Sequence, residues 1–336
     1  WRFCLPCQWQ PASAVPTSSR HTPASSAGSF PQNAMAALAA WLPSWAEFVA
    51  DLTPTPPFPE TDPFRLIARH SNWQGYNLHF FRSADFQVFN GYVWSIETGL
   101  RWEVPLFFVS MYILAIFAAK EKFTIKVELR STALCWNVML SVFSMCGFLA
   151  CAPVLFSELR SNGLYFCTCA HAGWYGTGTH GAFVAAFVYS KFFELGDTFL
   201  LLAAGRKVIL LHWWHHATVL LFCWHSYSAQ TSTGIWFASM NYGVHAVMYA
   251  YFAVTQTSFR KAVQKFAIYI TLLQLCQMLL GISIIVRAIL YQIGGKECNV
   301  NKTNSILGLA MYFSYFGLFL KLFLENYVFK AKAKAA

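Results

Sequence analysis

The sequence predicts an all-α membrane protein with seven transmembrane helices, and three observations support this fold class. Hydrophobic residues make up 57% of the chain and charged residues only 11%, whereas a soluble domain carries roughly 25% charged residues. Seven apolar runs follow one another, each near the roughly 20 residues that a helix needs to cross a bilayer. Polar side chains recur inside several of these runs at the spacing of one helical face.

The chain outside the apolar runs divides into an N-terminal part and a short tail. Residues 1–34 precede the first methionine and are rich in Ser, Pro and Ala, so we expect a non-native or disordered leader. Residues 35–95 are expected to form a lumenal or interfacial segment, with an apolar helix over 35–52 and a Pro-rich linker over 54–63. Residues 96–329 form the seven-helix domain, and 330–336 a basic cytosolic tail.

The seven apolar runs define the expected helices. They extend over Trp102–Ala119, Ala133–Leu155, His180–Ala204, Val208–Tyr227, Gly234–Val254, Phe266–Leu290 and Ile306–Val328.

The basic residues predict the orientation of these helices. The net charge of +10 is concentrated in short loops, which is typical of membrane topology and does not indicate nucleic-acid binding. Basic clusters follow the first, third, fifth and seventh runs, and the other loops are poor in them. The positive-inside rule then places the N-terminus in the lumen and the C-terminus in the cytosol.

The C-terminal tail contains two lysines, Lys332 and Lys334, at the fifth and third positions from the end. This spacing matches a di-lysine retrieval signal of the endoplasmic reticulum, an address that is read by a receptor. The alternative is an ordinary basic tail beside a membrane helix. We favour the retrieval signal and expect a multi-pass protein of the endoplasmic reticulum membrane.

Ionisable residues inside the third run are the first candidates for function, because such groups are costly in a membrane. Lys191, Glu194 and Asp197 are spaced by three residues in the segment KFFELGDT, near one helical face. The alternative is an ion-pair ladder that only orients helices.

A histidine cluster in the fourth run is the second candidate. His212, His215 and His216 occupy positions i, i+3 and i+4 of the segment HWWHH, so their imidazoles share a face. A single histidine in such a run is often a satisfied core residue, whereas three at this spacing indicate a site. The remaining histidines stand alone in loops or at the edges of runs and are interpreted as surface or interfacial groups: His21, His70, His79, His171, His180 and His225.

The next two runs add polar groups at the same spacing. The fifth carries Asn241, His245 and Tyr249, one helical turn apart, and the sixth carries Thr271, Gln274 and Gln277. With the predicted orientation, His212 lies about 7 Å and Gln274 about 13 Å inside the cytosolic boundary, at 1.5 Å per residue. A substrate with a cytosolic polar head and an apolar tail would place its reactive carbon there, and acyl-CoA has that shape.

Four segments resemble the signature blocks of the ELO fatty-acid elongases, in the same order and spacing: KFFELGDT, HWWHH, NYGVHAVMYAYF and TLLQLCQ. The resemblance covers residues 99–329. The third block is similar to that of the subclass acting on saturated and monounsaturated chains. This likeness implies a preference for saturated chains of about twelve to sixteen carbons.

The resemblance implies seven helices, six of them in a closed barrel around an acyl tunnel. It also implies the condensation of malonyl-CoA with a long-chain acyl-CoA, giving 3-ketoacyl-CoA, CO2 and CoA, the first step of the fatty-acid elongation cycle. The implied partners are these two substrates, membrane lipid, and the reductases and dehydratase of the cycle. No cofactor and no nucleic acid is expected. The sequence leaves the oligomeric state open, with a homodimer as one option.

The candidate residues can be assigned roles in this reaction. Our hypothesis is acyl transfer to His215, since imidazole acts as a nucleophile as well as a base. His212, His216 and Asp197 would be its base and orienting groups, and His245 with Asn241 would support the acceptor and the enolate oxygen. We assign no role to the nearby Cys223 and Cys276. The expected substrate-binding residues are Lys191, Glu194, Thr198, Asn241, Tyr249, Gln274 and Gln277.

Two other classes of protein, a di-iron enzyme and a receptor or transporter, fit the sequence less well. A di-iron desaturase or hydroxylase also carries HxxHH, but it needs about eight histidine ligands in three clusters, and this chain has one cluster plus His245. One metal held by the four imidazoles and Asp197 is a minor alternative, and we expect no metal. A receptor does not need such a cluster, and a transporter would often show paired interrupted helices.

Three cysteines fall on the predicted lumenal side, which is oxidising: Cys167, Cys169 and Cys298. The partner of Cys298 would be Cys167 or Cys169, unless it reaches Cys151. A bridge between Cys167 and Cys169 would close too small a ring. We favour Cys169–Cys298, with three free thiols as the alternative.

Overall fold

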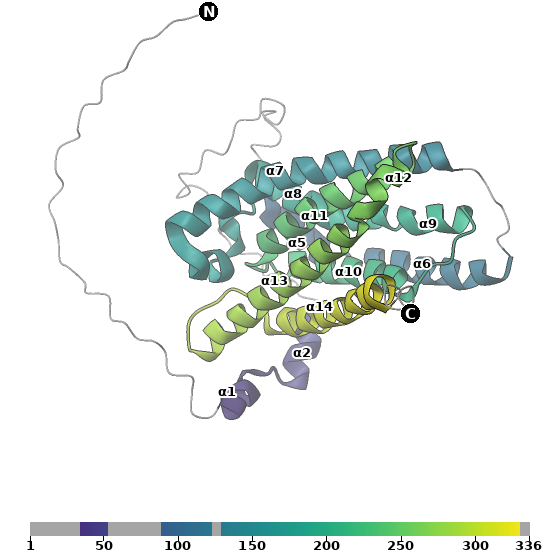
Figure 1. Cartoon of the computed structure of the whole chain (residues 1–336). Coiled ribbons are helices and arrows are strands. Elements are labelled where there is room, and N and C mark those ends of the chain that lie inside the picture. The colour runs from purple at the N-terminus through teal and green to yellow at the C-terminus, as the bar shows by residue number, and fades with distance from the viewer. Residues whose placement is uncertain (1–33, 53–88, 123–128, 330–336) are drawn as a thin grey trace, which may run out of the picture.

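The computed structural model describes residues 34–52, 89–122 and 129–329, and the regular elements in these ranges are helices (Figure 1). One isolated antiparallel bridge joins Asn90 and Thr177. The expected leader up to residue 33, the Pro-rich linker and the tail with its two lysines lie outside the described residues. The predicted all-α fold is confirmed for the described part of the chain.

Seven helical segments correspond to the predicted apolar runs, and the second extends 14 residues beyond its predicted end at Leu155. They are α6 (Glu103–Lys122), α7 (Arg130–Cys169), α8 (Gly178–Glu194) with α9 (Gly196–Ala203), α10 (Leu210–Ser228), α11 (Gly234–Thr255), α12 (Arg260–Val263) continued by α13 (Ala267–Ile293), and α14 (Lys302–Phe323) extended to Phe329. A shorter helix that was not predicted, α5 (Gly91–Gly99), precedes them and runs across the expected boundary between residues 95 and 96.

Three of these segments are long and apolar enough to cross a membrane, namely 130–169, 260–293 and 302–329. A fourth is obtained if α5 and α6, which meet at an angle of 62°, form one broken span. This finding covers only the described residues and supports a membrane protein.

The bundle has an arginine end and a disulfide end. The arginine end carries Arg130 at the start of α7, Arg206 before α10 and Arg260 at the start of α12. The disulfide end carries Cys169 at the end of α7 and Cys298 after α13, whose sulfur atoms are joined. The pair favoured from the sequence is thus the pair that the structure joins. Asn299 adds two hydrogen bonds to the Cys169 carbonyl, from its backbone and side-chain amides at 2.9 and 3.0 Å.

Helices α7 and α11 pack closely along their length because glycines allow it. A Cβ atom at Gly147 would meet the Tyr242 ring at 2.4 Å, and one at Gly243 would meet Phe148 at 3.0 Å. Near the disulfide end α7 turns at Gly163, whose φ of +79° is unfavourable for residues with a side chain. This turn directs Cys169 back toward the bundle.

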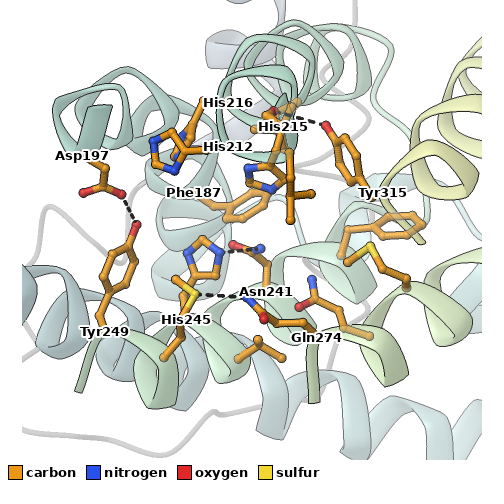
Figure 2. Close-up of a pocket in the computed structure, with 18 of the residues that line it drawn as sticks. Phe187, Asp197, His212, His215, His216, Asn241, His245, Tyr249, Gln274 and Tyr315 are labelled. Atoms are coloured by element: carbon orange, nitrogen blue, oxygen red, sulfur yellow. Dashed lines mark hydrogen bonds between the residues drawn. The ribbon is translucent and has the colours of Figure 1, made fainter. Parts of the chain in front are cut away.

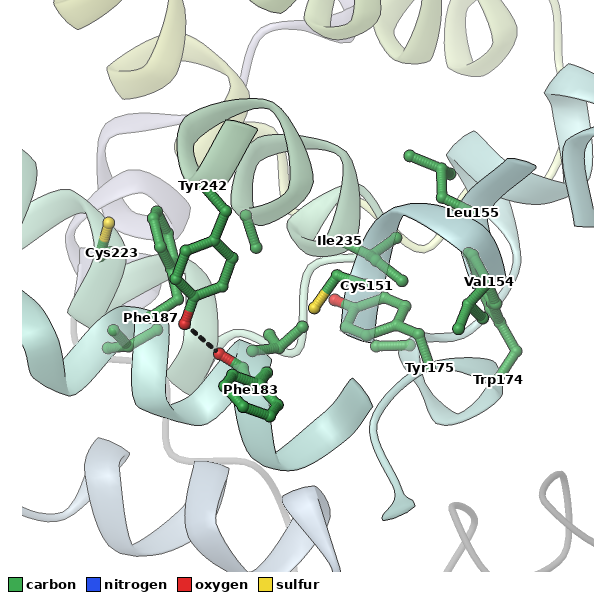
Figure 3. Packing of buried hydrophobic residues seen from close by; sticks show 14 of the residues in the cluster. Cys151, Val154, Leu155, Trp174, Tyr175, Phe183, Phe187, Cys223, Ile235 and Tyr242 are labelled. Carbon is green, nitrogen blue, oxygen red and sulfur yellow. Dashed lines mark hydrogen bonds between the residues drawn. The ribbon is translucent and has the colours of Figure 1, made fainter. Parts of the chain in front are cut away.

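A cluster of buried aromatic and aliphatic residues joins α7, α8, α10 and α11 (Figure 3). At its centre the Tyr242 hydroxyl donates to the Phe183 carbonyl at 2.8 Å, so this polar group is satisfied inside an apolar core. Nearby, the Tyr175 hydroxyl donates to the Thr231 carbonyl at 2.6 Å. These contacts fix α8 against α11, the two helices that face each other across the site.

The predicted third helix is divided in two, but Lys191 and Asp197 both still bond to residues of α11, namely Asn241 and Tyr249. Helix α8 ends at Glu194 and α9 begins at Gly196. The Trp136 ring occupies the space beside Gly196, where a Cβ would meet it at 2.7 Å. Asp197 bonds to Trp136 of α7 and to Tyr249 of α11.

The expected apolar helix over 35–52 is present as two short helices, α1 (Ala34–Trp41) and α2 (Trp45–Leu52), separated at Pro43. Helix α1 contacts α13 and α2 contacts α14. Trp41 is 6% exposed, and its indole donates to Gln292 Oε1 at 2.8 Å. The N-terminal helices are therefore docked onto the disulfide end of the bundle.

Candidate active site

A cavity of about 1100 Å³ runs along α10 and α11 through the centre of the bundle. Helices α8, α13 and α14 supply most of its remaining walls. It extends from the arginine end, at Arg130, Arg206 and Arg260, to the disulfide end, at Tyr227 and Thr231. An elongated cavity with a charged end and a largely apolar interior suits a long amphipathic molecule.

Helix α10 presents its three histidines to this cavity (Figure 2). The ring centroids of His212 and His216 are 4.5 Å apart, and those of His215 and His216 are 5.2 Å apart. The positions i, i+3 and i+4 thus bring the imidazoles together, as the spacing predicted.

The three rings differ in how they are held. His212 Nε2 lies 2.8 Å from Thr198 Oγ1, which in turn bonds to the Tyr112 hydroxyl at 2.8 Å. His216 Nδ1 is buried with no hydrogen-bond partner within the described residues. The His215 ring packs against Tyr315 with centroids 4.9 Å apart, and the Tyr315 hydroxyl donates to the His215 carbonyl at 3.2 Å.

Helix α11 supplies the opposite wall with Asn241, His245 and Tyr249. Asn241 Nδ2 lies 3.1 Å from His245 Nε2. The Tyr249 hydroxyl donates to Asp197 Oδ2 at 2.7 Å, and the Trp136 indole donates to Asp197 Oδ1 at 2.6 Å. The Asp197 carboxylate therefore orients Tyr249. The hydrogen bonds of Asp197 within the described residues go to Tyr249 and Trp136 and not to a histidine, and its predicted role beside His215 stays a prediction.

Helix α13 contributes the two predicted glutamines. Gln274 Nε2 lies 3.3 Å from the Met248 sulfur, and Gln277 is buried at the wall. Of the residues predicted for the site, nine line the cavity: Asp197, His212, His215, His216, Asn241, His245, Tyr249, Gln274 and Gln277.

Three predicted substrate-binding residues lie behind the cavity wall. Lys191, Glu194 and Thr198 are buried but are not among the lining residues. Lys191 Nζ is 2.5 Å from Glu194 Oε1 and 4.2 Å from the centre of the Phe187 ring, which does line the cavity. These residues lie against side chains that form the wall, and their predicted contact with the substrate stays a prediction.

Three aromatic residues that hold the site were missed from the sequence: Tyr112, Trp136 and Tyr315. Each carries a hydrogen-bonding group within an otherwise apolar helix. Buried Tyr and Trp usually find a polar partner, so such residues are candidates for holding polar side chains in place. The chain has 15 Tyr and 13 Trp, so this signal could not single out the three.

His225 corrects the interpretation of the isolated histidines as surface groups. It is 2% exposed, and its Nε2 donates to the Asp51 carbonyl at 2.7 Å. Its Nδ1 lies 2.8 Å from Asn304 Nδ2. Helix α2 covers this position, and no local pattern in the sequence predicts that docking.

The fold and the site together define a helical membrane protein with a histidine-lined internal cavity. Residues 98–335 match the family model described as the GNS1/SUR4 family, named ELO. The chain belongs to this family.

Curated relatives agree with this assignment. Fatty acid elongase 3 of Trypanosoma cruzi is 37% identical over 262 residues, which cover 69% of this chain and 86% of the relative. Very long chain fatty acid elongase 6 of Gallus gallus is 39% identical over 232 residues, 68% of this chain and 86% of the relative. Fatty acid elongase 1 of Trypanosoma brucei brucei is 40% identical over 204 residues, 59% of this chain and 67% of the relative.

Proposed function

We propose that this protein is a 3-ketoacyl-CoA synthase, which condenses malonyl-CoA with a long-chain acyl-CoA and releases CO2 and CoA. The observation that carries the proposal is the convergence of four imidazoles, from His212, His215, His216 and His245, on one elongated cavity. The names of the relatives in the same family support the same reaction.

The first step is acyl transfer to His215. Its ring lines the cavity, and neither ring nitrogen has a hydrogen-bond partner in the part of the chain that the structure describes. One nitrogen attacks the thioester carbonyl, the C–S bond breaks, and an acyl-imidazole forms. The proton lost from the ring passes to the CoA sulfur, with His212 or His216 as carrier.

The second step forms the new carbon–carbon bond. Malonyl-CoA loses CO2, and the electron pair of the broken bond remains as an enolate. The enolate carbon attacks the acyl-imidazole carbonyl, the C–N bond breaks, and the imidazole of His215 regains a proton from solvent. A hydrogen-bond donor at the enolate oxygen favours this step, and His245 on the opposite wall is suited to provide it.

The arginine end of the cavity suits the polar part of the substrates. Arg130, Arg206 and Arg260 line it, and guanidinium groups bind phosphate oxygens through paired hydrogen bonds. The CoA phosphates would lie there and the acyl tail would extend toward the disulfide end. Lys207, Lys261 and Lys265 lie at this end too, so the positive-inside rule supports a cytosolic mouth.

The membrane arrangement completes the proposal. All seven helical segments would cross the membrane, six of them as a barrel around the cavity, in the endoplasmic reticulum with the C-terminus cytosolic. The two tail lysines would serve as the retrieval signal. The reductases and dehydratase of the elongation cycle would act on the product, and the protein would function as a monomer or a homodimer.

The test is condensation by the purified protein with malonyl-CoA across a panel of acyl-CoAs. We expect 3-ketoacyl-CoA and CO2 in equal amounts, with the best substrates among saturated chains of about twelve to sixteen carbons. Highest activity on polyunsaturated acyl-CoA would contradict the substrate range, and absence of product from every acyl-CoA would contradict the function.

The desaturase alternative has no supporting observation. In the described ranges, no group of three or more His, Cys, Asp and Glu residues is arranged as metal ligands. Metal analysis of the purified active protein, with activity measured before and after chelation, distinguishes the two reactions.

A further inference from the structure

A chain of polar side chains begins behind the cavity wall, at Lys191 and Glu194, and ends in the wall at His245. Lys191 Nζ lies 2.5 Å from Glu194 Oε1 and 3.3 Å from Asn241 Oδ1. Asn241 Nδ2 then lies 3.1 Å from His245 Nε2. Ser190 Oγ also donates to Glu194 Oε1, at 3.2 Å. All of these side chains are buried, and their polar groups are satisfied largely by one another.

The direction of each hydrogen bond follows from the chemistry of Lys191. Paired with a carboxylate, its side chain is an ammonium group, which has three donors and no acceptor. The amide atom facing it must be the oxygen of Asn241, so the amide nitrogen faces the imidazole. An amide nitrogen is only a donor, and His245 Nε2 must therefore be the unprotonated ring nitrogen that accepts.

The proton of a neutral His245 consequently lies on Nδ1. This nitrogen is on the side of the ring away from Asn241 (Figure 2), and no hydrogen-bond partner for it exists within the described ranges. His245 lines the cavity. The ring therefore offers an N–H donor to whatever occupies the cavity, while its one lone pair is engaged by Asn241.

We propose that Lys191 and Glu194 are positioning residues that act through Asn241 to hold His245 in the Nδ1–H tautomer. His245 then serves as a hydrogen-bond donor to a substrate oxygen, and it is neither the base nor the nucleophile. The inference rests on the proposed condensation for the identity of that oxygen, which would be the enolate oxygen of malonyl-CoA after loss of CO2. It also explains why a lysine and a glutamate that do not line the cavity are buried beside it.

The tautomer can be observed directly in the purified full-length protein with ring-15N-labelled histidine. Protonated and unprotonated ring nitrogens have well-separated 15N shifts, and their couplings to the ring protons identify which nitrogen is which. The His245 signals are those lost in His245→Gln. We expect Nε2 to be the unprotonated nitrogen in the unsubstituted protein.

Asn241→Asp reverses the tautomer with almost no change in shape. A carboxylate accepts from Lys191 and also from the imidazole, so the ring proton moves to Nε2 and the cavity loses its donor. We expect kcat for condensation to fall by about 100-fold, as for the loss of one oxyanion donor. KM for the acyl-CoA should stay within about twofold, because the ground-state binding of the tail is untouched.

Two further variants serve as a control and as an alternative to Asn241→Asp. Asn162→Asp changes an exposed asparagine of α7 that bonds to Glu158, and it should alter neither kcat nor the His245 spectrum. The pair Lys191→Met with Glu194→Gln removes the donor that fixes the amide while keeping the buried site neutral. It should give a mixture of both tautomers and an intermediate kcat, and it replaces Asn241→Asp if that variant does not fold.

The outcomes separate this inference from the proposed function. A protonated Nε2 in the unsubstituted protein, or an unchanged tautomer in both variants, overturns the inference even if condensation is efficient. A protein that shows the expected tautomer but forms no 3-ketoacyl-CoA overturns the proposed function, and with it the role given to the donor.

Discussion

Two buried histidines, one near the disulfide end of the bundle and one in its middle, each have an asparagine partner but differ in how many ring nitrogens are bonded. At the disulfide end, His225 uses both ring nitrogens, one toward the Asp51 carbonyl and one toward Asn304. In the middle of the bundle, His245 uses only Nε2, toward Asn241. His245 lines the cavity and His225 does not. The second ring nitrogen therefore separates a structural histidine, in which it is bonded within the protein, from a histidine that can donate to a molecule in the cavity.

The surroundings of His225 and His245 differ in the same way, because polar groups are bonded within the protein around His225 but not all of them are around His245. The disulfide end is held by the Cys169–Cys298 bond, by the docked N-terminal helices and by Asn304, which bonds to both His225 and Ser226. The histidine cluster instead keeps His216 Nδ1 without a partner among the described residues, at a cost in stability. The polar groups at the disulfide end are bonded within the protein, whereas the histidine cluster keeps a ring nitrogen without a partner among the described residues.

The largest expected effect is on catalysis, from His215→Ala. We expect condensation to fall by about 1000-fold or more, as for loss of a nucleophile. The free energy of unfolding should fall by only about 1–3 kcal/mol, since an imidazole lost from a cavity wall leaves a small void. Product formation and thermal unfolding are measured on the same preparation. Activity that falls only in proportion to the folded fraction would contradict the assignment.

Removing the disulfide should have the largest effect on stability. Cys298→Ser frees a loop closed over a sequence separation of 129 residues, so we expect a loss of about 2–4 kcal/mol of unfolding free energy. Thermal unfolding with and without reductant measures it. Cys276→Ser is the control, because Cys276 is an exposed free thiol. If the two variants unfold at the same temperature, the bond does not stabilise the disulfide end.

His225→Ala tests the comparison from the structural side. The substitution leaves the Asn304 amide and the Asp51 carbonyl without their partner, so we expect a loss of about 1–3 kcal/mol of unfolding free energy. Turnover per folded molecule should stay close to that of the unsubstituted protein. Thermal unfolding and condensation rates give the two numbers. A loss of turnover comparable with His215→Ala would remove the distinction between the two kinds of histidine.

The smallest expected effect is at the docked N-terminal helices. Trp41→Phe removes the indole bond to Gln292 but keeps most of the apolar contact, and we expect a loss of about 1 kcal/mol. The matched variant Trp45→Phe should cost nothing measurable, because Trp45 is 78% exposed. Thermal unfolding of the pair checks this, and equal shifts would show that the indole bond contributes nothing.

The sequence predicted the helices and the side chains that line the cavity because both depend on local periodicity. Apolar runs located every long helix to within a few residues, apart from α7, which continues to Cys169 beyond the predicted Leu155. The spacing in HWWHH placed three imidazoles on one wall. These properties follow from 3.6 residues per turn and need no knowledge of the neighbouring helices.

Contacts between distant segments could not be predicted in this way. The break before Gly196 depends on the Trp136 ring, and the burial of His225 depends on α2. The separation of Lys191 and Glu194 from the cavity depends on how α8 faces α11. Each of these is a contact between distant segments, which the spacing of residues within one helix does not reveal.

Acyl transfer to His215 can be measured by incubating the purified protein with labelled acyl-CoA in the absence of malonyl-CoA and locating the label by peptide mass spectrometry. We expect CoA release with up to one acyl group per site, carried by His215, and transfer of this group to product when malonyl-CoA is added. Label on His225, or no acyl-protein at all while condensation proceeds normally, would contradict the claim that a free imidazole in the cavity carries the acyl group.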